Sequence, residues 1–150
     1  MDYVQKARDN FKKGYNCAQA VFCAFADKMD ISEEQAVKIA SSFGGGMGGM
    51  RETCGAVTGM FMAYGAICGY SDHADFEGKT AQYAKIREFA EKFKNEHETL
   101  RCGDLLKNLP TKLEQNPLPR TEEYYKVRPC VMFVETAAKI LQEELKKIEN

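Results

Sequence analysis

The 150-residue sequence has no excess of charge of either sign, no apolar run long enough to span a membrane and no C-x-x-C pair. A formal net charge of -1 gives no electrostatic basis for binding nucleic acid. The most apolar stretch, 54–70, is shorter than the roughly 20 residues that a membrane-spanning helix needs, so we predict a buried core helix. No basic segment leads into an apolar stretch near the start, which argues against a secretory signal and favours a cytoplasmic protein.

Sustained alternation of β-branched and polar residues, which is typical of half-buried strands, is also missing. Helical periodicity recurs along nearly the whole chain instead. With 44% hydrophobic and 29% charged residues, the composition is typical of an ordinary globular domain. We therefore predict an all-α fold, in which residues 1–150 form a single domain as a bundle of about six helices.

Capping side chains predict where several of these helices begin. Asn16 and Ser32 each stand three residues before a glutamine, the spacing of a capping box, and Thr53 directly precedes the apolar run. Further helices are expected from 75 to about 97 and after Pro129, which stands where a first helical residue is expected. The inner face predicted for the 75–97 helix consists of Phe76, Tyr83, Ile86, Ala90 and Phe93.

The stretch 44–59 contains seven glycines and lies between two of the predicted helices. The spacing of Gly44, Gly46 and Gly49 matches a dinucleotide-binding fingerprint. That fingerprint needs a preceding strand, whereas a helix is predicted before these glycines. A phosphate-binding P-loop is excluded as well, because Met50 and Arg51 follow where lysine and then serine or threonine are required. We interpret the stretch as a flexible connection whose amides can approach a ligand or a sulfur, or as a tight turn without a ligand.

Small residues continue along one face of the helix that follows this connection. Gly55, Gly59, Ala63 and Ala66 share that face, so another backbone can approach it closely. The face starts at the positive end of the helix, and we therefore predict that Gly55 and Gly59 are the cofactor-binding positions.

Residues 107–127 hold three of the four prolines and show no clear period. We predict a loop of about twenty residues, a length at which loops in compact domains are often lids or binding loops. This proline-containing loop is therefore a candidate cover for a functional site.

Four of the six cysteines lie at predicted helix beginnings: Cys17, Cys54, Cys102 and Cys130. A helix N-terminus stabilises a thiolate and lowers its pKa, and a nearby arginine acts in the same direction. An arginine precedes three of the four within three residues. We predict that these four cysteines form one functional site, whereas Cys23 and Cys68 fill the core.

The segments that carry these cysteines resemble the C-GCAxxG-C-C family, small helical proteins regarded as redox-active and frequent in anaerobic bacteria and archaea. The resemblance covers nearly the whole chain. Its segments are GYNCAQAV around Cys17, FGGGMGGMRETCGAVTG around Cys54, RCGDLL at Cys102 and RPCVMF at Cys130. The chain has Cys-Gly-Ala at 54–56, where the family label has Gly-Cys-Ala. The resemblance implies four paired or clustered cysteines and leaves the substrate open.

Three functions fit these residues. In the first, two of the four catalytic cysteines perform thiol-disulfide exchange or electron transfer with a redox protein or a small-molecule donor or acceptor, and Cys54 or Cys130 attacks first. Such a protein would be a thiol-dependent oxidoreductase without a cofactor. In the second, the same four cysteines are metal ligands for zinc or an iron-sulfur cluster. In the third, the chain is a non-catalytic helical module for ligand binding or assembly, including assembly into a homo-oligomer.

Overall fold

The computed structural model describes residues 2–110 and 112–149, in which eight α-helices and two short 3-10 helices follow one another. Residues 1, 111 and 150, all within the predicted domain, lie outside the described residues, and 111 is also part of the predicted loop. In chain order the elements are α1 (Tyr3–Lys12), α2 (Cys17–Ala24), η1 (Ala26–Lys28), α3 (Glu33–Ala40), η2 (Ser41–Phe43), α4 (Gly55–Cys68), α5 (Phe76–His97), α6 (Cys102–Leu105), α7 (Glu122–Val127) and α8 (Cys130–Glu149). The predicted all-α fold is confirmed.

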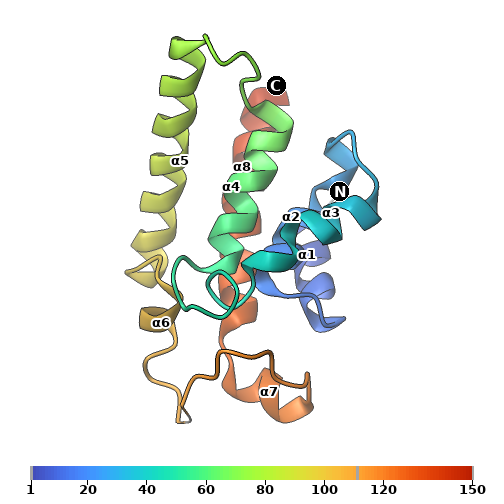
Figure 1. Cartoon of the computed structure of the whole chain (residues 1–150), viewed down its shortest axis with the longest axis vertical. Helices are drawn as coiled ribbons and strands as arrows, with labels where there is room; N and C mark the ends of the chain where they lie inside the picture. The colour runs from blue at the N-terminus through green and yellow to red at the C-terminus, as the bar shows by residue number, and fades with distance from the viewer. Residues whose placement is uncertain (1, 111, 150) are drawn as a thin grey trace.

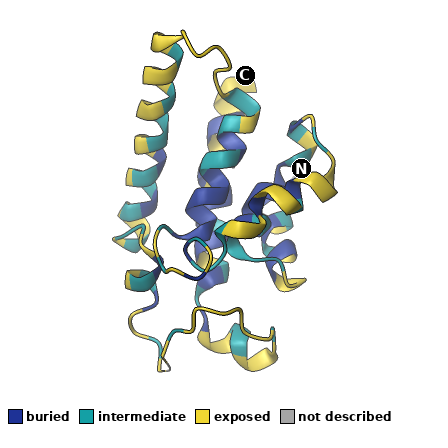
Figure 2. Cartoon of the chain, in the orientation of Figure 1, coloured by how far each residue is buried: buried dark blue, intermediate teal, exposed yellow. Residues whose placement is uncertain are grey.

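The central pair of helices is α4 and α8, with α1 to α3 on one side and α5 on the other (Figure 1). Both central helices begin at the same end of the molecule, where the glycine-rich connection, α6 and α7 also lie. Buried positions concentrate on α2, α4 and α8 (Figure 2). No helix among the described residues combines the length and apolar character that crossing a bilayer requires.

The helix beginnings follow the predicted caps in two cases and differ in the third. Asn16 and Ser32 form the predicted capping boxes, each accepting a hydrogen bond from the backbone N–H of the glutamine three residues later. The cap predicted at Thr53 is wrong, because Cys54 occupies the N-cap position of α4. Thr53 instead pairs with Arg101 in an isolated antiparallel bridge, and the helix therefore begins one residue later than predicted.

The small-residue face of α4 packs against α2. A Cβ atom added at Gly59 would lie 2.6 Å from the carbonyl oxygen of Ala18, so only glycine allows this approach. Ala63 continues the buried face, whereas Ala66 is exposed and does not belong to it. The close approach of a second backbone, predicted from the sequence, is thus found over the first half of α4.

Helix α5 reaches the core with part of the predicted face, including Ile86 and Phe93, and with Phe89, which was not predicted. Phe89 and Phe93 are fully buried, and the ring of Phe89 contacts that of Tyr64 edge to face at 5.1 Å. Phe76 and Tyr83, assigned to the inner face, are 78% and 53% exposed. Tyr83 lies six residues before Phe89, about 120° away around the helix, so both cannot face the core.

The predicted 107–127 loop ends in a short helix that the sequence analysis missed. The Thr121 side chain accepts a hydrogen bond from the N–H of Tyr124 and so caps α7, whose first turn carries Glu122 and Glu123. With α6, this helix raises the number of α-helices in the described part of the chain above the predicted six. The segment before Thr121 crosses the end of the molecule where α4 and α8 begin (Figure 1).

Candidate functional site

The glycine-rich connection makes a left-handed turn before α4. All five residues from Gly45 to Gly49 have φ between +59° and +80°, and four of them are glycines. That conformation costs about 1–2 kcal/mol for each residue with a side chain, which explains the glycine content. The N–H groups of Arg51 and Glu52 close the turn by donating to the carbonyl oxygens of Gly45 and Gly46.

Two of the four cysteines are held by the bridge between Thr53 and Arg101. The N–H of Cys54 donates to the carbonyl oxygen of Leu100 at 2.7 Å, and that of Cys102 donates to Glu52 at 2.6 Å. These bonds place the start of α4 beside the start of α6. The glycine turn packs directly on this unit, because a Cβ added at Gly46 would lie 2.6 Å from the Cβ of Cys102.

The other two cysteines are the first residues of α2 and α8. The thiols of Cys17 and Cys130 line the same small cavity, and each shifts the pKa of the other. Gly55 lets α2 come this close to α4, since an added Cβ there would lie 3.1 Å from the Cβ of Cys17. The pairing therefore depends on helix packing between segments that are far apart in the sequence.

All four predicted site cysteines line one small cavity of about 60 Å³. Three are buried, Cys17 is partly buried, and none forms a disulfide. Each lies at a helix beginning, as predicted, either as the first helical residue or, for Cys54, as the N-cap. Cys23 and Cys68 are not among the residues that line this cavity.

The pKa values of Cys17 and Cys130 are shifted in opposite directions. The hydrogen bond from Cys17, together with the positive charges of Arg128 and Arg120, lowers the pKa of Cys130 to about 7 despite its burial. The pKa of Cys17 is raised well above its ordinary value, because its thiol donates to Cys130 and because its sulfur is buried. Cys130, which has Arg128 and Arg120 beside it, is therefore the more acidic thiol of the pair.

The predicted lowering of the pKa fails at Cys17, and it fails at Cys54 and Cys102 as well. Burial raises the pKa of Cys54 to about 12, against the opposing effect of the backbone N–H groups of Ala56 and Val57. Burial also raises the pKa of Cys102, although Arg51 donates to its sulfur at 3.7 Å. The helix beginnings are present as predicted, but removing these sulfurs from water has the larger effect.

The metal role expected of the four cysteines stays a prediction. Within residues 2–110 and 112–149, no group of three or more histidine, cysteine, aspartate or glutamate side chains is positioned to hold a metal ion. Gly55 and Gly59, predicted to contact a cofactor, face the backbone of α2, and their cofactor role stays a prediction.

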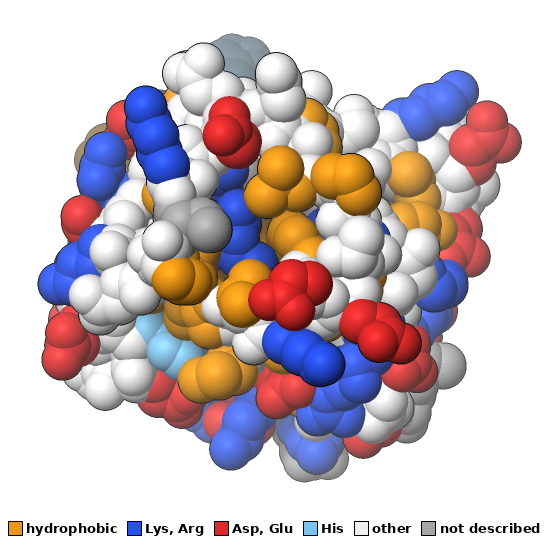
Figure 3. All heavy atoms as spheres, turned by 90° about the horizontal axis from the view of Figure 1, so that it is seen from below, with side chains coloured by type: hydrophobic (Ala, Val, Ile, Leu, Met, Phe, Trp, Pro, Cys, Tyr) orange, Lys and Arg blue, Asp and Glu red, His pale blue; other side chains and the backbone are white. Residues whose placement is uncertain are grey.

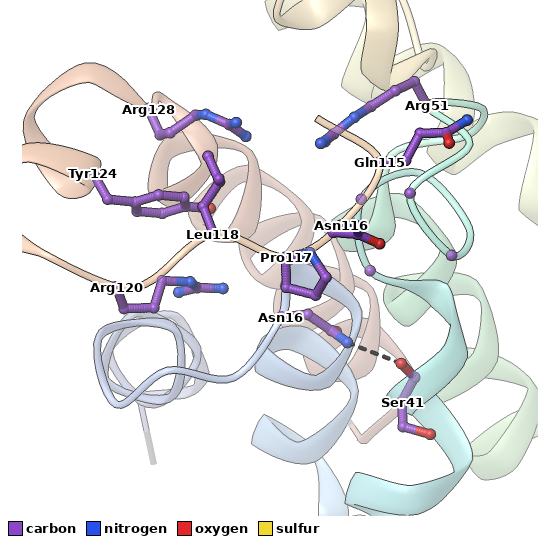
Figure 4. Close-up of a pocket in the computed structure, with 14 residues that line it drawn as sticks. Asn16, Ser41, Arg51, Gln115, Asn116, Pro117, Leu118, Arg120, Tyr124 and Arg128 are labelled. Carbon is purple, nitrogen blue, oxygen red and sulfur yellow. Dashed lines mark hydrogen bonds between the residues drawn. The ribbon is translucent and has the colours of Figure 1, made fainter. Parts of the chain in front are cut away.

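A larger cavity of about 290 Å³ adjoins the thiols and is lined by the glycine turn, residues 115–118 and α7 (Figure 4). Arg51, Arg120 and Arg128 line both cavities. The sequence analysis missed Arg120, since nothing in the local pattern of a proline-containing loop distinguishes it. Its guanidinium donates to the carbonyl oxygens of Phe11 and Tyr15 and so ties the loop to the end of α1.

The family model described as "Putative redox-active protein (C_GCAxxG_C_C)" matches residues 15–144. The chain belongs to this family. The matched residues of this C_GCAxxG_C_C protein include all four cysteines of the small cavity. The description of the family agrees with a redox-active role in general terms. Comparison with curated proteins and with solved structures found no significant match.

The alkylation rate of Cys130 is expected to follow an ionisation near pH 7. Its pKa is lowered to about 7 and the thiolate is the nucleophile, so the rate rises as the pH increases through this value. At two pH units below the pKa, the rate should be about 100-fold lower than the plateau reached when the thiol is fully ionised. Iodoacetamide labelling of the reduced protein, quantified by mass spectrometry of the Cys130 peptide, measures this profile.

Two matched variants control this measurement. Cys17→Ala removes the hydrogen bond that contributes most to the lowering and should move the midpoint to higher pH. Cys23→Ala changes a fully buried cysteine outside the cavity and should leave the midpoint unchanged. A wild-type midpoint near 9 would contradict the assignment of Cys130 as the more acidic thiol.

Proposed function

We propose that this C_GCAxxG_C_C protein is a thiol-disulfide oxidoreductase whose redox-active pair is Cys17 and Cys130. The observation that carries the proposal is that both thiols line one small cavity, where the Cys17 thiol, Arg128 and Arg120 lower the pKa of Cys130 to about 7. An attacking thiol works best when its pKa is near the ambient pH, because it is then both ionised and nucleophilic. Cys54, the other cysteine considered for this role, has a pKa of about 12 and is not the first nucleophile.

The proposed first step is attack of the Cys130 thiolate on one sulfur of a partner disulfide. The partner's S–S bond breaks, a mixed disulfide forms at Cys130, and the leaving thiolate takes up a proton. Cys17 then loses its proton and attacks the Cys130 sulfur, which releases the second partner thiol. Two electrons pass from the protein to the partner, and the Cys17–Cys130 disulfide remains. An external thiol reverses both steps.

The charge change in the first step activates the second thiol. The hydrogen bond to Cys130 and the negative charge there both raise the pKa of Cys17. Once the Cys130 sulfur is part of a mixed disulfide, it no longer carries that charge, so both contributions are removed. The pKa of Cys17 then falls toward its ordinary value, which favours the thiolate needed for resolution.

The direct test maps the disulfide that forms on mild oxidation. Reduced protein, treated with a chelator and then with one equivalent of a small disulfide, is alkylated, digested and analysed by mass spectrometry. We expect a Cys17–Cys130 crosslink, with the remaining cysteines alkylated. Recovery of all cysteines in alkylated form, or a crosslink that omits Cys130, would overturn the proposal. Stoichiometric zinc or iron in protein purified without oxygen and without chelator, with four protected thiols, would favour the metal alternative.

A further inference from the structure

The larger cavity shares part of its wall with the small cavity that the thiol pair lines. Asn16, Tyr124 and the three arginines line both this cavity of about 290 Å³ and the small one that holds the cysteines. Figure 4 shows Arg51 and Arg128 pointing toward one another from opposite sides of this space, with Arg120 reaching in from the side of α1. A molecule in the larger cavity would therefore contact side chains that also surround the thiols.

The charge of this cavity has one sign. Among the described residues that line the cavity there are three arginines and no aspartate or glutamate. Among the described residues, none of the three forms an ion pair with a carboxylate, since every observed ion pair involves other cations. Arg51 is held by the carbonyl oxygen of Glu114 and by Cys102, Arg120 by two carbonyl oxygens, and Arg128 by the ring of Tyr124.

One of these cations has a buried donor atom without an acceptor in the part of the chain that the structure describes. The Nε atom of Arg51 is buried, and within the described chain it has no hydrogen-bond partner. Arg128 is only 8% exposed, and its guanidinium lies beside the Cys130 sulfur. The Cys130 thiolate offsets a single positive charge, so the three arginines leave the cavity positive.

The remaining walls suit the carbon skeleton of a small molecule. Pro117, Leu118 and the ring of Tyr124 provide apolar surface, while the backbone of the glycine turn closes the opposite side. Seen from this end of the molecule, basic side chains are recessed between apolar ones (Figure 3). Planar guanidinium groups bind carboxylates in pairs of parallel hydrogen bonds, and such geometry discriminates among anions.

We propose that this cavity binds the carboxylate groups of a low-molecular-weight disulfide and presents its S–S bond to Cys130. The inference rests on the proposed function, because it names the class of disulfide that oxidises the Cys17–Cys130 pair. The electron balance is that of the two steps above. The anionic disulfide accepts two electrons, and both halves leave as carboxylate-bearing thiols.

The first test compares three disulfides of similar size and different charge. Reduced protein is mixed with 3,3′-dithiodipropionate, bis(2-hydroxyethyl) disulfide or cystamine, which are anionic, neutral and cationic. Each rate of disulfide formation is divided by the rate of the same compound with a free small thiol. We expect the anionic compound to react at least about 10-fold faster than the neutral one at low salt, with the advantage falling as salt is added. Equal normalised rates for all three would overturn the proposal.

A second test needs no redox chemistry and so separates the two proposals. Calorimetry measures binding of the thioether 3,3′-thiodipropionate, which has the same carboxylates and no disulfide. We expect saturable binding that Arg120→Gln weakens by about 10-fold or more, while Arg120→Lys retains part of it. Because Arg120 also ties the loop to α1, Arg51→Gln provides a second variant on another segment. Lys79→Gln removes the same charge from α5, outside the cavity, and should leave binding unchanged.

The outcomes of the two tests are distinguishable. Saturable, arginine-dependent binding of the thioether in a protein that forms no Cys17–Cys130 disulfide would refute the proposed function and support the anion site. Disulfide formation at equal normalised rates without thioether binding would refute the anion site and leave the proposed function standing. Inorganic sulfate binding as tightly as the thioether would overturn the assignment to carboxylates.

Discussion

A Cys130→Ser variant is expected to lose reaction with small disulfides, by about 100-fold or more, because a serine hydroxyl is not ionised at neutral pH. Cys17→Ser should behave differently. Cys130 can still attack, and a serine hydroxyl can still donate to its sulfur, but nothing resolves the product. The Cys17→Ser protein should therefore accumulate as a stable mixed disulfide with one half of the reagent. Intact-protein mass spectrometry over time distinguishes the two variants.

The control for these two variants is Cys23→Ser. Cys23 is fully buried outside the cavity, and burial raises its pKa to about 11, so it cannot substitute for the attacking thiolate. Its removal should leave the rate and the final disulfide unchanged in any protein that folds. A mixed disulfide that accumulates in Cys130→Ser instead of in Cys17→Ser would reverse the two roles.

A Gly59→Ala variant should be destabilised by about 1–3 kcal/mol, since the new Cβ would lie 2.6 Å from the carbonyl oxygen of Ala18 and α2 would have to move. Gly65→Ala, on the same helix, is the matched control. An added Cβ there has only the end of the Gln82 side chain, 3.9 Å away, within contact distance. Alanine is the better helix former, so Gly65→Ala should stabilise by about 0.5–1 kcal/mol. Denaturant unfolding measures both changes.

The Gly59 variant also connects packing to the redox pair. Helix α2 begins with Cys17, so a shift of this helix away from α4 changes the distance between Cys17 and Cys130. In the folded fraction of Gly59→Ala, we expect mixed disulfide at Cys130 to persist longer before resolution. Unchanged stability in Gly59→Ala, or equal effects of the two glycine substitutions, would show that the close contact between α2 and α4 does not constrain the fold.

Local signals in the sequence were sufficient for the helical class and for several helix beginnings. A capping box needs only residues three apart, so Asn16 and Ser32 could be recognised without knowing the fold. The inner face of α5 could not be recognised in this way, because its aromatic residues allow more than one apolar face. Contact with Tyr64 and α8 selects the face that contains Phe89 and Phe93.

The sequence by itself determined that the protein is helical and that four cysteines stand at helix beginnings, because caps and periodicity depend on neighbouring residues. Only the tertiary structure decided which thiols lie together and in which direction the pKa of each is shifted. The pKa of a thiol depends on burial and on charges that come from distant segments, as Cys17 and Arg120 do for Cys130. The same burial reversed the expectation for Cys54, whose helix beginning alone would have lowered its pKa.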